Sequence, residues 1–219
     1  DEKQRRELGA HYTSEKNILK VIQPLFLEEL YIEFDEVKYN SKKLEEFHKK
    51  LSKLKFLDPA CGCGNFLVTT YREIRKLELE VLKLKRKNNQ LSLLGTDELS
   101  IVNVNQFYGI EIEEFPSLVA RVAMYLVDHQ MNQLLSKEFG LYQARIPLRE
   151  PATIVNADAL TTDWQSVVPK NELSYILGNP PFVGARLMSK EQKEAFLKIF
   201  DNAKGAGNLD FVTAWYEKA

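Results

Sequence analysis

The sequence predicts an α/β fold in which a mostly parallel sheet carries helices on both faces. Four short apolar runs, at residues 54–58, 106–111, 153–156 and 173–178, have the length and composition of buried strands. Stretches with helical spacing of apolar residues separate the first three runs. Strands that alternate with helices in this way form parallel βαβ units, in which the carboxyl ends of the strands share one edge of the sheet.

Residues 1–53 precede the first apolar run and are expected to form a helical segment. Within them, a lysine-rich stretch at 42–55 is interleaved with Leu and Phe at helical spacing, and a second basic stretch lies at 83–87. Both stretches are candidates for a DNA-binding surface. The spacing favours solvated faces of amphipathic helices instead.

The first apolar run leads into a glycine turn. The run ends at Asp58, Pro59 breaks it, and a helix opens at Phe66. Gly62 and Gly64 are expected to let the backbone approach a ligand closely. The dinucleotide-binding fingerprint has a third glycine that this turn lacks, which favours a ligand without phosphates.

Two amphipathic helices are predicted between the strands. The first is long enough to project past the sheet and has apolar residues at alternating spacings of three and four: Leu67, Thr70, Ile74, Leu77, Val81 and Leu84. The second opens at Pro116, and its broad apolar face is predicted to contain Leu118, Val119, Val122, Ala123 and Leu126. His129 is interpreted as a packing or capping residue, and residues 139–151 as a connecting loop.

Acidic residues follow three successive strand runs. Asp58 ends the first, Glu111 ends the second, and Asp158 follows the third. Ligands of open α/β sheets lie beyond the carboxyl ends of the strands, so these acids are expected to converge on one crevice. Glu111 could accept hydrogen bonds from both hydroxyls of a ribose, and Asp158 from an adenine amine. Any single acid could instead cap the loop that follows it, but three in succession favour a binding site.

The sequence Asn179-Pro180-Pro181-Phe182 follows the fourth run and is suited to holding a flat amine. The two prolines remove backbone donors and present rigid carbonyl acceptors, and Asn179 adds a side-chain acceptor. Two acceptors on its N–H bonds would hold the lone pair of an aromatic amine towards an electrophile without a general base. Phe182 could stack on an unpaired base, a contact worth roughly 1–3 kcal/mol. The alternative is an ordinary proline turn with Phe182 in the core.

The last forty residues or so carry helical signals. Ser189 and Gln192 form a capping box, and residues 209–219 are predicted to be helical. Between these helices, the glycine-rich residues 203–207 are predicted to form a mobile loop beside the base on which Phe182 could stack.

This order of motifs resembles the class I adenosylmethionine-dependent methyltransferases that modify the exocyclic amine of adenine in DNA. The segment Gly9-Ala10-His11-Tyr12-Thr13 looks like the motif that closes over the methionine end of the cofactor, placed N-terminally as in the gamma arrangement. The sequence around Asn65-Phe66-Leu67, and from Gly178 to Gly184, is similar to the MmeI-like single-chain restriction-modification enzymes.

The resemblance implies a Rossmann-like class I methyltransferase sheet. A complete sheet of this class has seven strands, so residues 1–219 are expected to be a partial catalytic domain, truncated after the fourth strand, with its sheet core and catalytic loop in residues 54–219. The implied cofactor is S-adenosyl-L-methionine. Its implied contacts are Tyr12, Thr13, Asp58, Ala60, Gly62, Gly64, Asn65, Phe66, Glu111, Ile112, Asp158, Ala159 and Asn179. The implied catalytic residues are Asn179, Pro180, Pro181 and Phe182. Cys63 stands where the family more usually has a small hydroxyl residue.

The implied activity is direct transfer of a methyl group to a flipped adenine in double-stranded DNA, a step that needs no metal ion. In enzymes of this kind, target-recognition and nuclease domains are covalently linked to the methyltransferase, and here they are expected outside this chain.

Other functions are compatible with parts of the pattern. A protein-glutamine methyltransferase can use a similar clamp for a planar amide, although the N-terminal Tyr-Thr motif argues against it. An enzyme for the cytosine amine would more usually have Ser in place of Asn179. A nuclease site is half matched by Glu36-Val37-Lys38, but no Asp lies between Glu2 and Phe34 to complete it. The chain could also be a non-catalytic cofactor- or DNA-binding fragment of a bifunctional nuclease.

Composition sets further limits. With 44% hydrophobic residues, a chain of 219 residues can bury one sizeable core. No run approaches the roughly 18 apolar residues of a membrane helix and no signal peptide is recognisable, so a cytoplasmic location is expected. Thirty basic and 31 acidic residues give a net charge of −1, so a basic DNA-binding surface would be local or lie outside the chain.

The two cysteines are not expected to have a redox or metal role. A disulfide between Cys61 and Cys63 would be strained across one residue, and no further Cys or His cluster completes a zinc site. Both are interpreted as small side chains that allow close packing.

Overall fold

The computed structural model describes residues 13–87, 100–140 and 150–219. Within these ranges, parallel strands form one sheet in the order β3-β2-β1-β4, which confirms the predicted α/β fold. Each strand falls inside its predicted run: β1 (Phe56–Asp58), β2 (Phe107–Glu111), β3 (Thr153–Asn156) and β4 (Tyr175–Ile176).

The parallel register brings the functional loops to one edge of the sheet. Asp58 pairs with Gly109, and Glu111 pairs with Asn156. Helix α5 (Asn65–Lys87) connects β1 to β2, and helix α7 (Glu114–Phe139) connects β2 to β3. The loops after β1, β2, β3 and β4 therefore all leave from the same edge.

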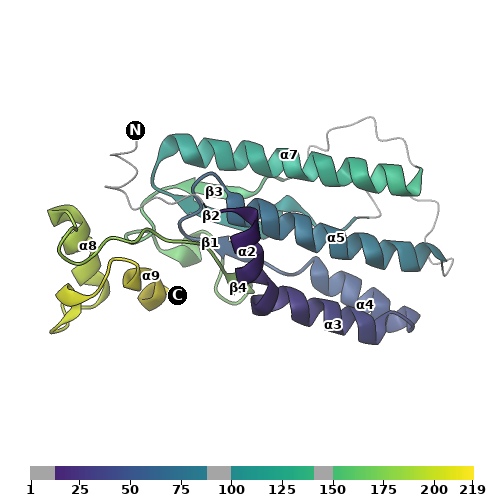
Figure 1. Cartoon of the computed structure of the whole chain (residues 1–219), viewed down its shortest axis with the longest axis horizontal. Coiled ribbons are helices and arrows are strands. Elements are labelled where there is room, and N and C mark those ends of the chain that lie inside the picture. The colour runs from purple at the N-terminus through teal and green to yellow at the C-terminus, as the bar shows by residue number, and fades with distance from the viewer. Residues whose placement is uncertain (1–12, 88–99, 141–149) are drawn as a thin grey trace.

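One face of the sheet is covered by α5 and α7 together with the N-terminal helices (Figure 1). These are α2 (Glu15–Ile22), the π-helical turn η1 (Gln23–Leu27), α3 (Glu28–Val37) and α4 (Ser41–Leu51). The predicted pattern of α5 is confirmed, because Leu67, Thr70, Ile74, Leu77 and Val81 are all buried and Leu84 packs against the same core. As predicted, α5 projects well past the short strands (Figure 1).

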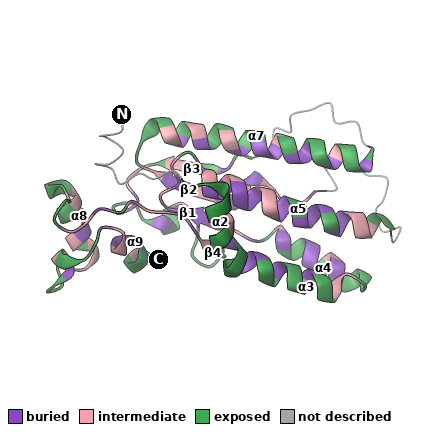
Figure 2. Cartoon of the chain, in the orientation of Figure 1, coloured by how far each residue is buried: buried purple, intermediate pink, exposed green. Residues whose placement is uncertain are grey.

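The opposite face carries a second core, and this confirms that helical segments lie on both faces. Strand residues alternate between the faces: Phe56 points into the first core and Leu57 into the second. The second core is completed by η3 (Trp164–Ser166), α8 (Lys190–Ile199), η4 (Ala206–Asn208) and α9 (Thr213–Lys218). Figure 2 marks the buried residues of these segments in purple.

The C-terminal helices differ in part from the prediction. The capping box of Ser189 and Gln192 is present at the start of α8. The helix predicted at residues 209–219 is shorter, because Leu209 has an extended backbone after η4 and α9 begins only at Thr213. The predicted loop at 203–207 runs into η4, where Ala206 is buried, and its mobility stays a prediction.

The predicted apolar face of α7 is wrong in part, since of its five residues only Val119 and Ala123 are half-buried. The helix begins at Glu114, two residues before Pro116, and Leu118, Val122 and Leu126 are exposed. The buried face instead contains Ser117, Ala120, Met124, Val127 and Met131. The small Ala120 explains this choice, because it lets α7 approach the glycine turn closely: a Cβ on Gly64 would lie 3.1 Å from the Ala120 Cβ. The loop predicted after α7 falls mainly on residues 141–149, outside the described part of the chain.

A buried polar network joins α5 to α7 behind the sheet. Arg75, which is 3% exposed, donates to Tyr71 Oη at 2.5 Å and to Asp128 Oδ1 at 3.2 Å. It also pairs with Glu78 at 3.1 Å, which in turn contacts His48 of α4 at 3.1 Å. Removing one partner of such a network would leave a buried charge unpaired, so the network holds the three helices in one arrangement.

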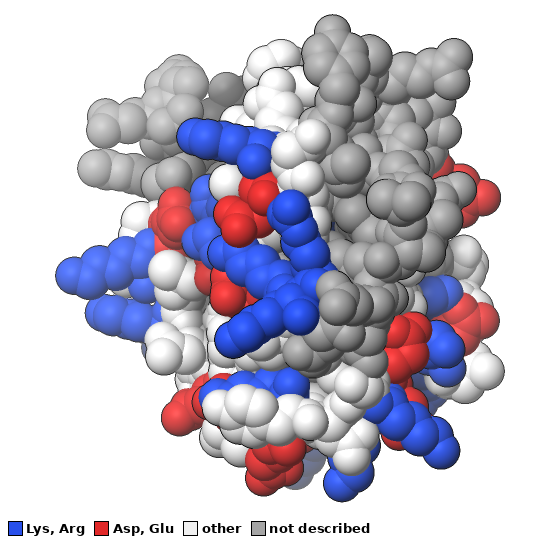
Figure 3. Space-filling view, turned by 90° about the vertical axis from the view of Figure 1, so that its right-hand side faces the viewer, with Lys and Arg blue, Asp and Glu red and all other residues white. Residues whose placement is uncertain are grey.

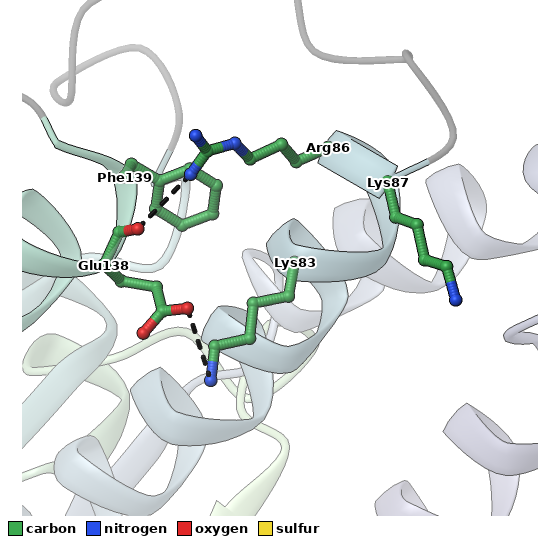
Figure 4. Close-up of a pocket in the computed structure, with 5 residues that line it drawn as sticks. All are labelled: Lys83, Arg86, Lys87, Glu138 and Phe139. Carbon is green, nitrogen blue, oxygen red and sulfur yellow. Dashed lines mark hydrogen bonds and ion pairs between the residues drawn. The ribbon is translucent and has the colours of Figure 1, made fainter.

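The end of the molecule far from the strand-end loops is rich in charge. Figure 3 looks onto this end and shows Lys and Arg side chains interspersed with Asp and Glu. A hollow there is lined by Lys83, Arg86, Lys87, Glu138 and Phe139 (Figure 4). Lys83 pairs with Glu138, and Arg86 donates to the Glu138 carbonyl. The interleaving of both signs agrees with the interpretation of 83–87 as a solvated helix face. The hollow lies a helix length, roughly 33 Å, from the start of α5.

Candidate active site

The three acids at the strand ends each hold the turn that follows them. Asp58 accepts a hydrogen bond from the Ala60 N–H at 3.0 Å, Glu111 from the Glu113 N–H at 2.9 Å, and Asp158 from the Leu160 N–H at 2.8 Å. The local capping role considered as an alternative is therefore present in all three. It does not exclude ligand binding, because an ionised carboxylate has about four acceptor positions.

Glu111 joins two strand-end loops. Its Oε2 accepts the Gly62 N–H at 2.8 Å, so the end of β2 is tied to the glycine turn after β1. Asn156, at the end of β3, donates from Nδ2 to the carbonyls of Glu111 and Ile112, both at 2.9 Å. Ile112 itself is 60% exposed beside these contacts. The arrangement fixes the Glu111 carboxylate and leaves acceptor positions and an apolar surface at this edge of the sheet.

Asp58 is buried and lies under the backbone of Gly178. It is only 1% exposed, and burial raises its pKa to about 7, with a smaller contribution from the charge of Glu111. Gly178 has a positive φ of 151°, and a Cβ there would lie 2.4 Å from Asp58 Oδ1. The residue before Asn179 must therefore be glycine if the Asp58 carboxyl is to keep its place.

The glycine turn has one open and one packed glycine. Gly62 has a φ of 53°, and no atom lies within 4 Å of where a Cβ on it would be, so space remains beside it as predicted. Gly64 is buried against Ala120, and its role in ligand approach stays a prediction. Of the other implied contacts, Ala60 and Asn65 are half-buried.

Three side chains of this region serve the protein core or face solvent. Phe66 is 5% exposed, and its ring is part of the core that α5 covers. Cys61 is also buried and packs against Gly109, where a Cβ would lie 2.8 Å from its Sγ. Cys63 is exposed, so the close-packing interpretation is right for Cys61 and wrong for Cys63.

The loop after β3 is held by α9 and η3. Ala159 is buried, and its carbonyl accepts from the Trp164 Nε1–H at 2.8 Å. Lys218 donates to the carbonyls of Ala159, Leu160 and Thr162 at 2.7, 2.9 and 2.7 Å. Burial lowers the pKa of Lys218, while the nearby Asp158 and Asp163 act against this shift. The ammonium group thus fixes the loop that carries Asp158.

The Asn-Pro-Pro-Phe segment leaves β4 at the same edge. Asn179, Pro180 and Pro181 are half-buried, whereas Phe182 is 57% exposed. The interpretation that places Phe182 in the core is therefore wrong. The next residue, Val183, is buried, and its carbonyl accepts the Phe211 N–H at 2.9 Å. The segment is anchored on both sides while the Phe182 ring stays accessible.

The Asn179 side chain is held by the segment before α2. Its Nδ2 donates to Thr13 Oγ1 at 3.1 Å, across 166 positions of sequence. The structure therefore brings Thr13 to Asn179. Tyr12, the neighbouring implied cofactor contact, lies outside the described residues.

Residues 34–219 match the family model of the MmeI DNA-methyltransferase domain. The chain belongs to the MmeI DNA-methyltransferase domain family. It is similar to a solved structure of the Type IIL restriction-modification enzyme MmeI in complex with DNA, with a TM-score of 0.94 and 56% identity over 100% of this chain. It is also 40% identical, over 98% of its length, to DNA methyltransferase A of Bacillus subtilis (strain 168).

A more distant relative of this MmeI-type domain is a putative type II restriction enzyme and methyltransferase of Methanocaldococcus jannaschii, 27% identical over 46% of this chain. All of these relatives are much longer. The chain spans 24% of the Bacillus protein, 8% of the Methanocaldococcus protein and 29% of the MmeI chain.

The MmeI-type site contains supporting residues that the sequence did not reveal. Asn156 holds the Glu111 loop and Lys218 holds the Asp158 loop, but neither is among the implied cofactor contacts. Trp215 is a third, because its Nε1–H donates to the Pro59 carbonyl at 3.1 Å. Only the position of Asn156 between Glu111 and Asp158 in the strand-end pattern hinted at such a role. The contacts of α9 with the first and third strand-end loops depend on tertiary packing.

Proposed function

We propose that this chain is the methyltransferase domain of a site-specific DNA adenine methyltransferase in a restriction-modification enzyme. The methyl group would come from S-adenosyl-L-methionine, and the acceptor would be the exocyclic amine of adenine in double-stranded DNA. The observation that carries this proposal is the placement of Asn179 and the exposed Phe182 shortly after β4, which pairs with β1, the strand that leads into the glycine turn. Membership of the MmeI family and the DNA complex of its 56% identical relative support DNA as the partner.

The groups at the carboxyl edge of the sheet suit the proposed methyl donor. Burial raises the pKa of Asp58 to about 7, and a cationic ligand beside it would favour its ionised form. Glu111 keeps acceptor positions for ribose hydroxyls, and the space beside Gly62 admits a ligand. S-adenosyl-L-methionine carries a cationic sulfonium and a ribose, and it would supply an electrophilic methyl group.

The clamp residues would position the acceptor amine. The Asn179 amide oxygen and a proline carbonyl would accept its two N–H bonds, so that the nitrogen lone pair faces the methyl donor. Phe182 would stack on the flipped base, which the duplex releases at a cost of a few kcal/mol. Alignment of two reactants in a dry site can supply most of the rate acceleration.

The proposal extends beyond the chain. Because the Bacillus relative and MmeI are three to four times longer, we propose that target-recognition and nuclease domains are linked to residues 1–219 in the whole enzyme. We also propose that it acts in the cytoplasm, together with its DNA. Among the described residues, no helix combines the length and apolar character needed to cross a membrane.

Two variants separate the proposed roles. The chain is incubated with S-adenosyl-L-methionine and unmethylated plasmid DNA, the DNA is digested, and the nucleosides are identified by mass spectrometry. Asn179→Ala is expected to abolish formation of N6-methyladenine while the calorimetric Kd for the donor stays within about threefold. Glu111→Ala is expected to weaken donor binding about tenfold or more, because it removes charged hydrogen bonds. Equal loss of donor binding in both variants would refute this division.

The identity of the product tests the substrate. Detection of N4-methylcytosine in the digest, in place of N6-methyladenine, would identify cytosine and not adenine as the target base. Methylation of a glutamine peptide, with none of the DNA, would overturn the proposal in favour of a protein methyltransferase.

A further inference from the structure

The orientation of the Asn179 amide matters for the proposed reaction. An asparagine side chain has one acceptor end and one donor end, and its terminal torsion has two broad, roughly opposite minima. With the oxygen towards the target amine, Asn179 accepts a hydrogen bond from it. With the amide reversed, an N–H group would face another N–H group and the clamp would repel the amine.

The backbone of Asn179 is already restricted on both sides. Pro180 follows it and limits the preceding residue to an extended backbone. Gly178 precedes it and packs against the Asp58 carboxyl. With the backbone restricted in this way, the orientation of the Asn179 amide depends on the rotation of its side chain.

Thr13 contacts the donor end of this amide. The Asn179 Nδ2 donates to Thr13 Oγ1 at 3.1 Å, which directs Oδ1 away from Thr13. Thr13 is well placed to act as a fixed point. The next residue, Ser14, is the N-cap of α2, and the Ser14 carbonyl accepts a hydrogen bond from the Ile18 N–H at 3.0 Å. Ile18 is 1% exposed in the core, and Glu15 of the same helix pairs with Arg72 of α5 at 2.9 Å.

We propose that Thr13 is a positioning residue that keeps the Asn179 amide oxygen facing the target amine. This inference rests on the proposed function, and it gives Thr13 a role other than the cofactor contact that the family resemblance implies. The hydroxyl acts through Asn179 and touches neither the amine nor the methyl group.

The test compares three variants of this chain. Thr13→Val keeps the shape and removes the hydroxyl, Thr13→Ser keeps the hydroxyl, and Ser14→Ala removes a neighbouring exposed hydroxyl that makes no capping bond. Single-turnover methylation of plasmid DNA is measured at saturating S-adenosyl-L-methionine, and the donor Kd is measured by calorimetry. Thr13→Val is expected to lower the rate about tenfold, the effect of one lost hydrogen bond, with the Kd within about threefold. Thr13→Ser and Ser14→Ala are expected to stay within about threefold of the wild-type rate.

A second measurement reads the amide directly. In ¹⁵N-labelled protein, the side-chain NH₂ resonances of Asn179, assigned by their loss in Asn179→Ala, are expected to shift in Thr13→Val and to be retained in Thr13→Ser. A wild-type rate in Thr13→Val would overturn the inference. So would a weakened donor Kd with an unchanged saturated rate, because that pattern marks a cofactor contact.

Failure of the proposed function is distinguishable from failure of this inference. If the whole enzyme that contains this chain binds no S-adenosyl-L-methionine and methylates neither DNA nor peptide, the proposed function fails. The Asn179 resonances then decide whether Thr13 orients the amide, and identical resonances in wild type and Thr13→Val would overturn that too.

Discussion

Replacing Gly178 by alanine tests whether Asp58 of the proposed cofactor site and the Asn-Pro-Pro-Phe segment share one packed contact. The new Cβ would lie 2.4 Å from Oδ1 and 3.0 Å from Cγ of the buried Asp58. The backbone would also be held at a φ of 151°, where side-chain-bearing residues are strained by about 1–3 kcal/mol. Overpacking of a closed site adds about 1–3 kcal/mol. The expected loss in the free energy of unfolding is therefore roughly 2–6 kcal/mol.

Gly140→Ala is the matched control for the backbone part of this loss. Gly140 ends α7 with a φ of 66°, and no atom lies within 4 Å of where its Cβ would be. Its substitution is expected to cost about 1–2 kcal/mol, the strain of a left-handed backbone alone. The free energies are measured by urea unfolding followed by circular dichroism, with unchanged m-values as the sign of an intact two-state transition.

The clash itself is isolated by a double-mutant cycle. In an Asp58→Ala background the carboxyl is gone, so Gly178→Ala is expected to cost about 1–3 kcal/mol less than in the wild type. Gly178→Ala is also expected to weaken S-adenosyl-L-methionine binding, because Asp58 must move. The reasoning is refuted if Gly178→Ala destabilises no more than Gly140→Ala, or if the cycle shows no coupling with Asp58.

Two further predictions concern the charges of the site. The pKa of Asp58 is raised above its unfolded value, so burial of its charge costs no stability below about pH 4 and destabilises the fold progressively as the pH rises to about 7. The difference in unfolding free energy between wild type and Asp58→Asn should therefore change by roughly 4 kcal/mol from pH 4 to pH 8. A difference that is independent of pH would contradict the assignment. Lys218→Met removes the donor to three carbonyls of the loop after β3 and should weaken S-adenosyl-L-methionine binding about fivefold in calorimetry. The control Lys190→Met, at an exposed position, should leave the Kd unchanged. Equal Kd values for both variants would mean that α9 does not support the proposed cofactor-binding loop after β3.

The parts of the fold that follow from local pattern could be predicted from the sequence. The strands, the long helix α5 and the capping box of α8 each depend on residues within a few positions of one another. The convergence of Asp58, Glu111 and Asp158 also follows, because a parallel sheet places successive carboxyl ends at one edge. These predictions needed no knowledge of distant contacts.

The errors arise where distant contacts decide. Helix α7 has apolar residues around most of its circumference, and its buried face was selected by the close approach of Ala120 to Gly64. Spacing within the helix cannot reveal that choice. The contact of Thr13 with Asn179 spans 166 positions, and no local pattern predicts which end of an amide it fixes.

The packing of Gly178 against Asp58 joins the proposed cofactor site to the Asn-Pro-Pro-Phe segment. Asn179 is bounded by Gly178, which rests on Asp58, by the ring of Pro180, and by the hydroxyl of Thr13. Asp58 lies at the end of β1, and β4 is joined to β1 by the hydrogen bond from the Leu177 N–H to the Leu57 carbonyl at 2.9 Å. If the Asp58 carboxyl moves when a cationic ligand pairs with its ionised form, that movement reaches Asn179 through one intervening residue. Binding of the methyl donor and alignment of the acceptor amine should accordingly be coupled, and substitutions at Gly178 should impair both.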